Sequence, residues 1–247
     1  MIYDIMCGDC LDLLPGISTA SVDMILCDLP YGTTRNKWDV VIPFAPLWEQ
    51  YRRVLKPNGA IVLFGSEPFS SQLRMSNLPM YRYDWIWRKN KATQHLNANR
   101  MPLLDYEVLS VFYSALPEYH PIMGEGKAYS NNHKPGDAGD CYGKVGHSRV
   151  ENRTTRYPRR IIDFPVDIKA EFHPTQKPVP LLEYLIQTYT SPGQVVLDNS
   201  MGSGSTGVAC MNTGRAFIGI ELDQTYFDAA SGRIRAAYYE NEGSKAA

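Results

Sequence analysis

The sequence has almost no net charge, few cysteines and no long apolar run. It holds 25 Lys and Arg residues against 26 Asp and Glu residues, so overall charge does not indicate a nucleic-acid partner. No apolar stretch approaches the ~20 residues that a membrane-spanning helix needs. Residues 1–5 lack the basic and apolar regions of a signal peptide. We therefore expect a cytoplasmic protein.

The five cysteines do not indicate a metal centre. Cys7 and Cys10 form a C-x-x-C pair, but no second pair accompanies them and the nearest histidine is the distant His95. Because a structural zinc site needs four ligands, we predict no metal site. A redox-active pair stays open as an alternative to reduced, partly buried thiols.

The pattern of the chain predicts an α/β fold with a mainly parallel, twisted sheet. Its 247 residues, 44% of them hydrophobic, are enough for one large or two small domains. Strands are expected at 2–6, 22–26, 60–64, 83–87, 108–113, 194–197 and 216–220, and helices at 10–14, 44–54, 70–75, 179–189, 206–211 and 224–239. Alternating strands and helices favour a parallel sheet covered on both faces.

Residues 114–165 interrupt this alternation. They are rich in Gly, Pro, Asn, His and basic residues, and between positions 141 and 170 seven Lys and Arg face three Asp and Glu. A structureless loop of that length is unusual inside a compact core. We interpret the segment as an inserted recognition region whose local charge suits phosphate contacts, with a solvated loop as the alternative.

A polar tetrapeptide follows the apolar run at 22–27. It consists of Asp28, Leu29, Pro30 and Tyr31. Ligands of open α/β sheets bind at the carboxyl ends of strands, where this segment is expected to lie. Asp28 and the Leu29 carbonyl can each accept an N–H from a planar amine, Tyr31 can stack on its ring, and Pro30 fixes the turn.

A glycine loop follows the strand expected at 194–197. Asp198 begins it, Gly202, Gly204 and Gly207 lie within it, and Glu221 comes nineteen residues after Gly202, where a carboxylate can accept ribose hydroxyls. The glycines also match the G-x-G-x-x-G pattern of dinucleotide sites. The D-x-x-x-G-x-G spacing favours S-adenosylmethionine (SAM), with a dinucleotide or a turn without ligand as alternatives.

Taken together, the two motifs resemble those of the β-class SAM-dependent DNA amino-methyltransferases. The tetrapeptide resembles their D-P-P-Y signature, with Leu29 in place of the first proline, and the order of tetrapeptide, insertion and glycine loop matches the class. The resemblance implies a Rossmann-like catalytic domain over 1–113 and 166–247 and a target-recognition insertion over 114–165. Asn199 and Ser200 depart from the Pro-Phe that is frequent in the family.

The resemblance also implies roles for individual residues. Residues 173–178, H-P-T-Q-K-P, resemble the segment that holds the methionine end of SAM, and Gly8-Asp9-Cys10 resembles a turn near its adenine. The implied cofactor-binding residues are Asp9, Cys10, Ser66, Thr175, Gln176, Lys177, Asp198, Ser200, Gly202, Gly204, Glu221 and Leu222. The implied DNA-binding residues are Arg35, Lys37, Asn97, Arg100, Lys144, Arg149, Arg153, Arg156, Arg159 and Arg160.

The activity that the resemblance implies is site-specific methylation of the exocyclic N6 amine of adenine in duplex DNA after base flipping. Asp28 favours adenine, because cytosine-N4 enzymes of the family more often carry serine there; cytosine-N4 methylation and a dinucleotide-dependent oxidoreductase stay open as alternatives. A cytosine-C5 enzyme is not indicated, since the chain has no Pro-Cys pair. The expected partners are duplex DNA, a second copy of the chain and a cognate restriction endonuclease, in a bacterium or phage.

Overall fold

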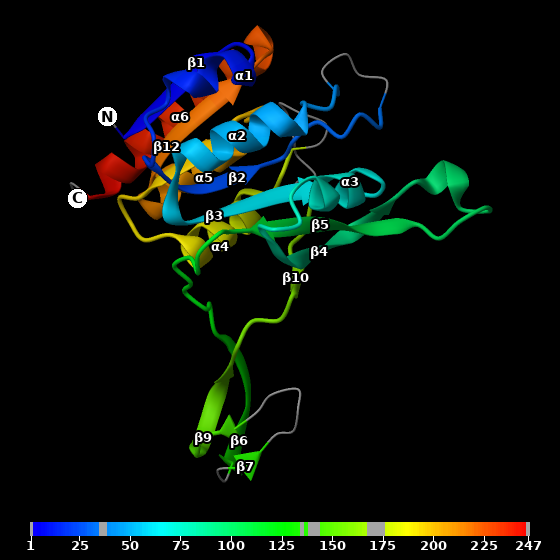
Figure 1. Ribbon diagram of the computed structural model, residues 1–247, viewed down its shortest axis with the longest axis vertical. Coiled ribbons are helices and arrows are strands. Elements are labelled where there is room, and N and C mark those ends of the chain that lie inside the picture. Colours follow the sequence, from blue (N-terminus) through cyan, green and yellow to red (C-terminus); the bar gives the residue numbers. More distant parts are fainter. Residues whose placement is uncertain (1, 35–38, 134–135, 138–143, 167–175, 246–247) are drawn as a thin grey trace. The chain divides into compact units, whose positions relative to one another are not determined.

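The computed structural model describes residues 2–34, 39–133, 136–137, 144–166 and 176–245 (Figure 1). The chain divides into two units. The first comprises Met1–His120 and Arg160–Ala247, and the second comprises Pro121–Arg159.

The first unit is built on an eight-stranded sheet. In spatial order its strands are β1 (Tyr3–Cys7), β12 (Ala216–Glu221), β11 (Val195–Asp198), β2 (Val22–Cys27), β3 (Leu55–Gly65), β5 (Leu104–Phe112), β4 (Tyr81–Thr93) and β10 (Ile161–Asp163). Neighbours from β1 to β3 pair in parallel, as do β4 and β10, whereas β5 runs antiparallel to β3 and β4. The predicted mainly parallel sheet is thereby confirmed.

Helices cover both faces of this sheet, and each face has its own apolar core. One core contains residues of α1 (Cys10–Leu13), η1 (Leu14–Gly16), α2 (Phe44–Val54) and α3 (Phe69–Ser76). The other contains residues of α4 (Val179–Tyr189), α5 (Ser205–Thr213) and α6 (Gln224–Lys245). All six residues of β2 are buried between them, as expected for a central parallel strand. None of the described helices is both long and apolar enough to cross a bilayer.

The helix α2 shows how the sequence specifies these layers. Its buried residues Leu47, Trp48, Tyr51 and Val54 recur at helical spacing and form one apolar stripe, while Arg52 and Arg53 lie in its last turn. Burial of that stripe fixes the side of the sheet on which the helix packs. The observed bounds of α2 equal the predicted 44–54.

Three parts of the sheet differ from the prediction. The strand β3 already begins at Leu55, five residues before the predicted 60–64. The strand β4 continues to Thr93, well past the predicted end at 87, and β5 begins at Leu104, before the predicted start at 108. The short η2 helix (His95–Asn97) lies between these two strands. Beyond the body of the sheet the two strands pair with each other, and their exposed or half-buried residues carry no apolar alternation that would reveal a strand. The strand β10 has only three residues and adds an edge that the sequence pattern does not indicate.

The second unit contains paired strands where little periodicity was visible. Here β6 (Gly124–His133) pairs antiparallel with β9 (Ser148–Arg156), and β7 (Gly136–Asp137) with β8 (Lys144–Val145). Most described side chains of β9 are exposed, so no buried face imposes a period of two on its sequence. The unit spans less of the chain than the predicted insertion at 114–165, and its assignment to target recognition stays a prediction.

Candidate active site

A cavity of about 420 Å³ opens at the carboxyl ends of the parallel strands of the first unit. Asp28 follows β2, Asp198 ends β11, Glu221 ends β12, and the turn at Gly8 follows β1; all four residues line the cavity. The carboxyl ends of neighbouring parallel strands lie along one edge of a sheet, which explains why segments far apart in sequence meet here. The structure thus brings the tetrapeptide and the glycine loop to one site.

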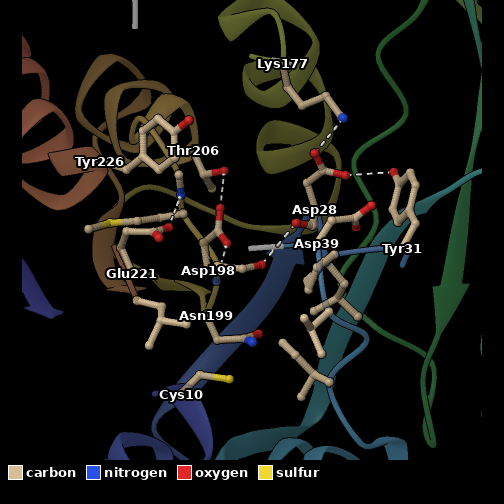
Figure 2. Close-up of a pocket in the computed structure, with 18 of the residues that line it drawn as sticks. Cys10, Asp28, Tyr31, Asp39, Lys177, Asp198, Asn199, Thr206, Glu221 and Tyr226 are labelled. Atoms are coloured by element: carbon tan, nitrogen blue, oxygen red, sulfur yellow. Dashed lines mark hydrogen bonds and ion pairs between the residues drawn. The ribbon is translucent and has the colours of Figure 1, made fainter. Parts of the chain in front are cut away.

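Asp28, which lines the cavity directly after β2, is held by three contacts. The Tyr31 hydroxyl donates to its Oδ1 at 2.7 Å, and the ammonium of Lys177 lies 2.6 Å from its Oδ2. Figure 2 shows Asp28 between these two partners. Ser200 Oγ donates to the main-chain oxygen of Asp28 at 3.0 Å, which fixes the peptide plane that leads into Leu29.

Tyr31 and Leu29 are positioned by packing. The Tyr31 ring stacks on Phe69, with centroids 4.9 Å apart and planes at 25°, so Phe69 covers one of its faces. Burial, together with the nearby Asp28 charge, raises the pKa of Tyr31, which keeps its hydroxyl a donor. The Leu29 side chain is buried against the core that contains α2.

Lys177 lines the cavity and lies close to two carboxylates of the protein. Its side chain is 9% exposed, and its ammonium lies near two carboxylates of the protein, 2.6 Å from Asp28 and 3.3 Å from Glu107. Burial disfavours the charged ammonium, but the two carboxylates outweigh that effect and raise the pKa of Lys177. A role toward a ligand carboxylate stays a prediction.

Glu107 is a site residue that the prediction did not include. It comes from β5, lines the cavity and also pairs with Lys89, whose Nζ lies 2.5 Å from its Oε1. Burial disfavours its ionised form, yet Lys177 and Lys89 lower its pKa. The sequence offers only the weak signal of Asp105-Tyr106-Glu107, which does not show which acid faces the cavity.

The opposite side of the cavity carries two buried carboxylates. Asp198 accepts from Thr206 Oγ1 at 2.7 Å and from the Ser200 N–H at 3.1 Å, and burial raises its pKa to about 6. Glu221 accepts the N–H groups of Gly202 at 2.8 Å and Asp223 at 2.9 Å, and burial raises its pKa as well. Both acids are therefore oriented before any ligand binds.

The glycines of the loop serve two different purposes. Gly202 has φ +53°, donates its N–H to Glu221 and lines the cavity. Gly204 has φ +79° and does not line the cavity; a Cβ there would lie 2.8 Å from Ala230 Cβ of α6. At Gly207 a Cβ would lie 2.4 Å from Ile234 Cδ1. Gly204 and Gly207 thus allow α6 to pack closely.

Asn199 and Asp39 also line the cavity, although the prediction gave neither a site role. Asn199 Oδ1 accepts from Tyr51, while its buried Nδ2 has no hydrogen-bond acceptor. Asp39 accepts the N–H groups of Gly32, Thr33 and Thr34 at 2.6–2.9 Å. Burial opposes ionisation of Asp39, but these donors lower its pKa. A single polar residue in a loop gives no sequence signal for such a role.

Most of the predicted cofactor residues meet in the cavity. Those lining it are Asp9, Cys10, Gln176, Lys177, Asp198, Ser200, Gly202, Glu221 and Leu222, together with the tetrapeptide at 28–31. The structure does not bring Ser66 to the cavity lining, because it follows β3, on the far side of β2 from the glycine loop. Thr175 lies outside the described residues. Among the residues that the structure describes, no cluster of His, Cys, Asp and Glu is arranged for a metal ion.

The predicted DNA-binding residues lie in several places. Arg35, Lys37 and the Lys144 side chain fall outside the described part of the chain; Asn97 and Arg100 lie between β4 and β5. In the second unit Arg156 lies over the Tyr129 ring at 4.2 Å, Arg153 over Tyr157 at 5.2 Å, and Arg149 is bound to Glu151; Arg159 is exposed there. Arg160 belongs to the first unit, where it lies over Tyr83. Their contacts with DNA stay predictions.

Comparison with known proteins gives consistent matches over nearly the whole chain. The DNA methylase family of N6/N4 methyltransferases matches residues 22–232. The DNA adenine methyltransferase YhdJ of Escherichia coli strain K12 is 30% identical over 95% of this chain and 84% of its own length. The type II methyltransferase M.HpaI of Haemophilus parainfluenzae is 26% identical over 95% of this chain and 74% of its own length.

Solved structures agree with these matches. The crystal structure of the M1.HpyAVI–SAM complex has a TM-score of 0.63 and 26% identity, and the match covers 94% of this chain and 99% of that one. The cytosine-N4-specific PvuII DNA methyltransferase has a TM-score of 0.70 at 14% identity, covering 98% and 93% of the two chains, and supports the fold alone.

Proposed function

The chain belongs to the N6/N4 DNA methylase family, and on that premise we propose that it transfers a methyl group from SAM to the exocyclic N6 amine of adenine in duplex DNA. The observation that carries this proposal is the position of Asp28 on the same cavity as Asp198 and Glu221. One side of the cavity can therefore accept an amine while the other binds the methyl donor.

The charges of the cavity fit SAM. Its described lining contains six carboxyl residues, Asp9, Asp28, Asp39, Glu107, Asp198 and Glu221, and a single ammonium, that of Lys177. A ligand with a sulfonium and an ammonium group is attracted by such a surface, whereas the pyrophosphate of a dinucleotide is repelled. Glu221 lines the cavity, where its carboxylate can accept ribose hydroxyls, and the unpaired Asn199 Nδ2 offers a donor. When bound, SAM supplies the activated methyl group.

The protein contributes acceptors and a fixed geometry. An aromatic amine is a poor nucleophile because its lone pair is delocalised into the ring. Asp28 and the Leu29 carbonyl accept its two N–H groups, which localises the lone pair, and Asp28 then stabilises the positive charge that develops on the nitrogen. Ser200 and Pro30 hold the turn, so that the amine is in line for displacement when it arrives.

Recognition of DNA is assigned to the basic second unit and to the segments around Tyr31. The adenine leaves the helix to reach Asp28, and Tyr31 stacks on it. Phosphates are bound by arginines such as Arg153 and Arg156, which are both partly exposed on β9. A homodimer and a cognate endonuclease stay predictions from the family.

The test is transfer of a labelled methyl group from SAM to duplex DNA, followed by digestion to nucleosides. We expect N6-methyladenine, and we expect Asp28→Ala to lose the activity while still binding SAM. Detection of N4-methylcytosine instead would show that the substrate base is cytosine and not adenine. Full activity of Asp28→Ala would show that the mechanism is wrong.

A further inference from the structure

A buried row of alternating charges extends from Asp28 into the sheet. Lys177 lies between Asp28 and Glu107, and Lys89 lies on the other side of Glu107, with N–O separations of 2.6, 3.3 and 2.5 Å along the row. Apart from Asp28, whose side chain is 29% exposed, the members are at most 13% exposed. Charges in this environment are poorly screened, so each member is sensitive to the position of its neighbours.

The arrangement around Asp28 conflicts with its proposed task. Tyr31 occupies Oδ1 and Lys177 occupies Oδ2, at distances typical of strong hydrogen bonds. An incoming amine must also donate to this carboxylate. The Lys177 ammonium is itself an N–H donor, so it competes with the amine for Asp28 Oδ2 and neutralises the negative charge that the amine would meet.

Glu107 provides the second place for that ammonium. Its Oε2 is buried, lies 3.3 Å from Lys177 Nζ and has no hydrogen-bond donor at regular geometry, whereas its Oε1 is anchored by Lys89. A movement of the ammonium by about 0.5 Å would turn the longer contact into a regular charge-assisted hydrogen bond. A flexible lysine stem with three rotatable donors permits such a movement.

We propose that Lys177 is a positioning residue with two partners: it neutralises Asp28 while the base pocket is empty, and it shifts to Glu107 Oε2 when the target amine takes Asp28. The proposal rests on the proposed function, since the amine that displaces the ammonium is that of the flipped base. The shift keeps every buried charge paired at each stage, and it leaves the full charge of Asp28 facing the nitrogen that becomes positive.

The first test needs neither DNA nor SAM. The coupling between Lys177 and Glu107 is measured as the non-additivity of the melting-temperature shifts of Lys177→Met, Glu107→Gln and the double variant, first in the wild-type background and then in Asp28→Asn. When Asp28 loses its charge, the Lys177 ammonium should move to Glu107. The coupling between Lys177 and Glu107 should therefore be at least twice as large in the Asp28→Asn background as in the wild-type background. Equal coupling in both would overturn the proposal. If the Met variants do not fold, Lys177→Gln replaces them.

A matched control comes from another ion pair of the same unit. Lys56 Nζ lies 2.8 Å from Asp23, and neither residue lines the cavity. The coupling of Lys56→Met with Asp23→Asn should be the same with and without the Asp28→Asn change. A control coupling that also doubles would mean that Asp28→Asn perturbs the whole unit, and it would overturn the specific shift of Lys177.

The second test uses single-turnover methylation of duplex DNA. Glu107→Gln removes the second partner, so Lys177 stays on Asp28, and we expect the rate to fall about tenfold or more with a SAM Kd changed less than about twofold. Adding Lys177→Met frees Asp28 and should restore much of the rate. A fixed, purely structural network predicts that the double variant is slower than either single variant, which would refute the shift.

These two tests separate the inference from the function on which it rests. A wild-type protein that methylates no adenine would overturn the proposed function, whereas the thermal cycle would still report whether Lys177 changes partner when the Asp28 charge is removed. An unchanged cycle in an active enzyme would overturn the two-partner role alone.

Discussion

Binding of SAM should depend on the ionisation of Asp198 between pH 7 and pH 5. This carboxyl is 3% exposed, and burial raises its pKa to about 6 in the ligand-free protein. We expect the ammonium group of SAM to lie beside Asp198, and only the ionised carboxylate attracts it. The apparent Kd should therefore rise by a factor of 1 + 10^(6 − pH), which is about 1.1 at pH 7 and about 11 at pH 5.

The assay is a titration of the protein with SAM by calorimetry at constant ionic strength. Measurements stay at or below pH 7, because an α-amino group such as that of the ligand itself titrates near pH 8. Asp198→Asn should bind weakly and should lose the part of the slope that belongs to Asp198. The pKa of Glu221 is also raised by burial, so Glu221→Gln is the matched control and should keep the slope that belongs to Asp198. A wild-type slope that survives in Asp198→Asn would refute the reasoning.

Stability of the ligand-free protein should change in the opposite direction. Folding raises the pKa of Asp198 from 3.8 to about 6, so the folded state binds the proton more tightly than the unfolded state. The resulting stabilisation is fully present at pH values below 3.8 and is lost as the pH rises through about 6. The loss is on the order of 3 kcal/mol for the shift from 3.8 to about 6. The increase in Tm produced by SAM should therefore shrink from pH 7 to pH 5, while Asp198→Asn shows neither trend.

Two further predictions concern packing and DNA. Gly207→Ala places a Cβ 2.4 Å from Ile234 Cδ1, and the overlap should cost about 1–3 kcal/mol of folding stability. We expect Tm to fall by about 2–12 °C and Ile234→Val to reverse part of that fall. An unchanged Tm would contradict the packing role of Gly207. Binding of duplex DNA should become weaker as the salt concentration rises, and the slope of log affinity against log salt can be measured by fluorescence anisotropy. Arg153→Ala and Arg156→Ala should each reduce that slope by about one. Arg149→Ala should change it less, because the guanidinium of Arg149 already has a carboxylate partner.

The sequence predicted best where one physical signal dominated. The helices at 44–54 and 179–189 have the predicted bounds, because their apolar stripes are buried against the sheet and a proline lies at or just before each start. The outer parts of β4 and β5 were missed because they gain their stability from pairing with each other and bury little apolar surface. Pairing between strands leaves no periodic mark on a sequence unless one face is buried.

The site was predictable to the extent that topology alone determines it. Asp198 and Glu221 end buried parallel strands and Asp28 directly follows one, so the three residues had to share an edge. Ser66 was misplaced because its strand also ends at that edge, but two strands away from β11, or roughly 10 Å at the usual strand spacing. The partners of Lys177 depend on which acids its ammonium reaches, and residue spacing does not encode that choice.

The strand order also explains why methyl donor and target amine can be handled in one cavity. From β2 the sheet continues through β3 on one side and through β11, β12 and β1 on the other, so the change of direction falls between β2 and β11. Ligands of open sheets bind at such a point. The ends of these two strands carry Asp28 and Asp198, and Ser200 links them, since its N–H binds Asp198 and its hydroxyl binds the main chain of Asp28. Ser200 is therefore a direct hydrogen-bonded link between the glycine loop and the residue that we propose as the amine acceptor.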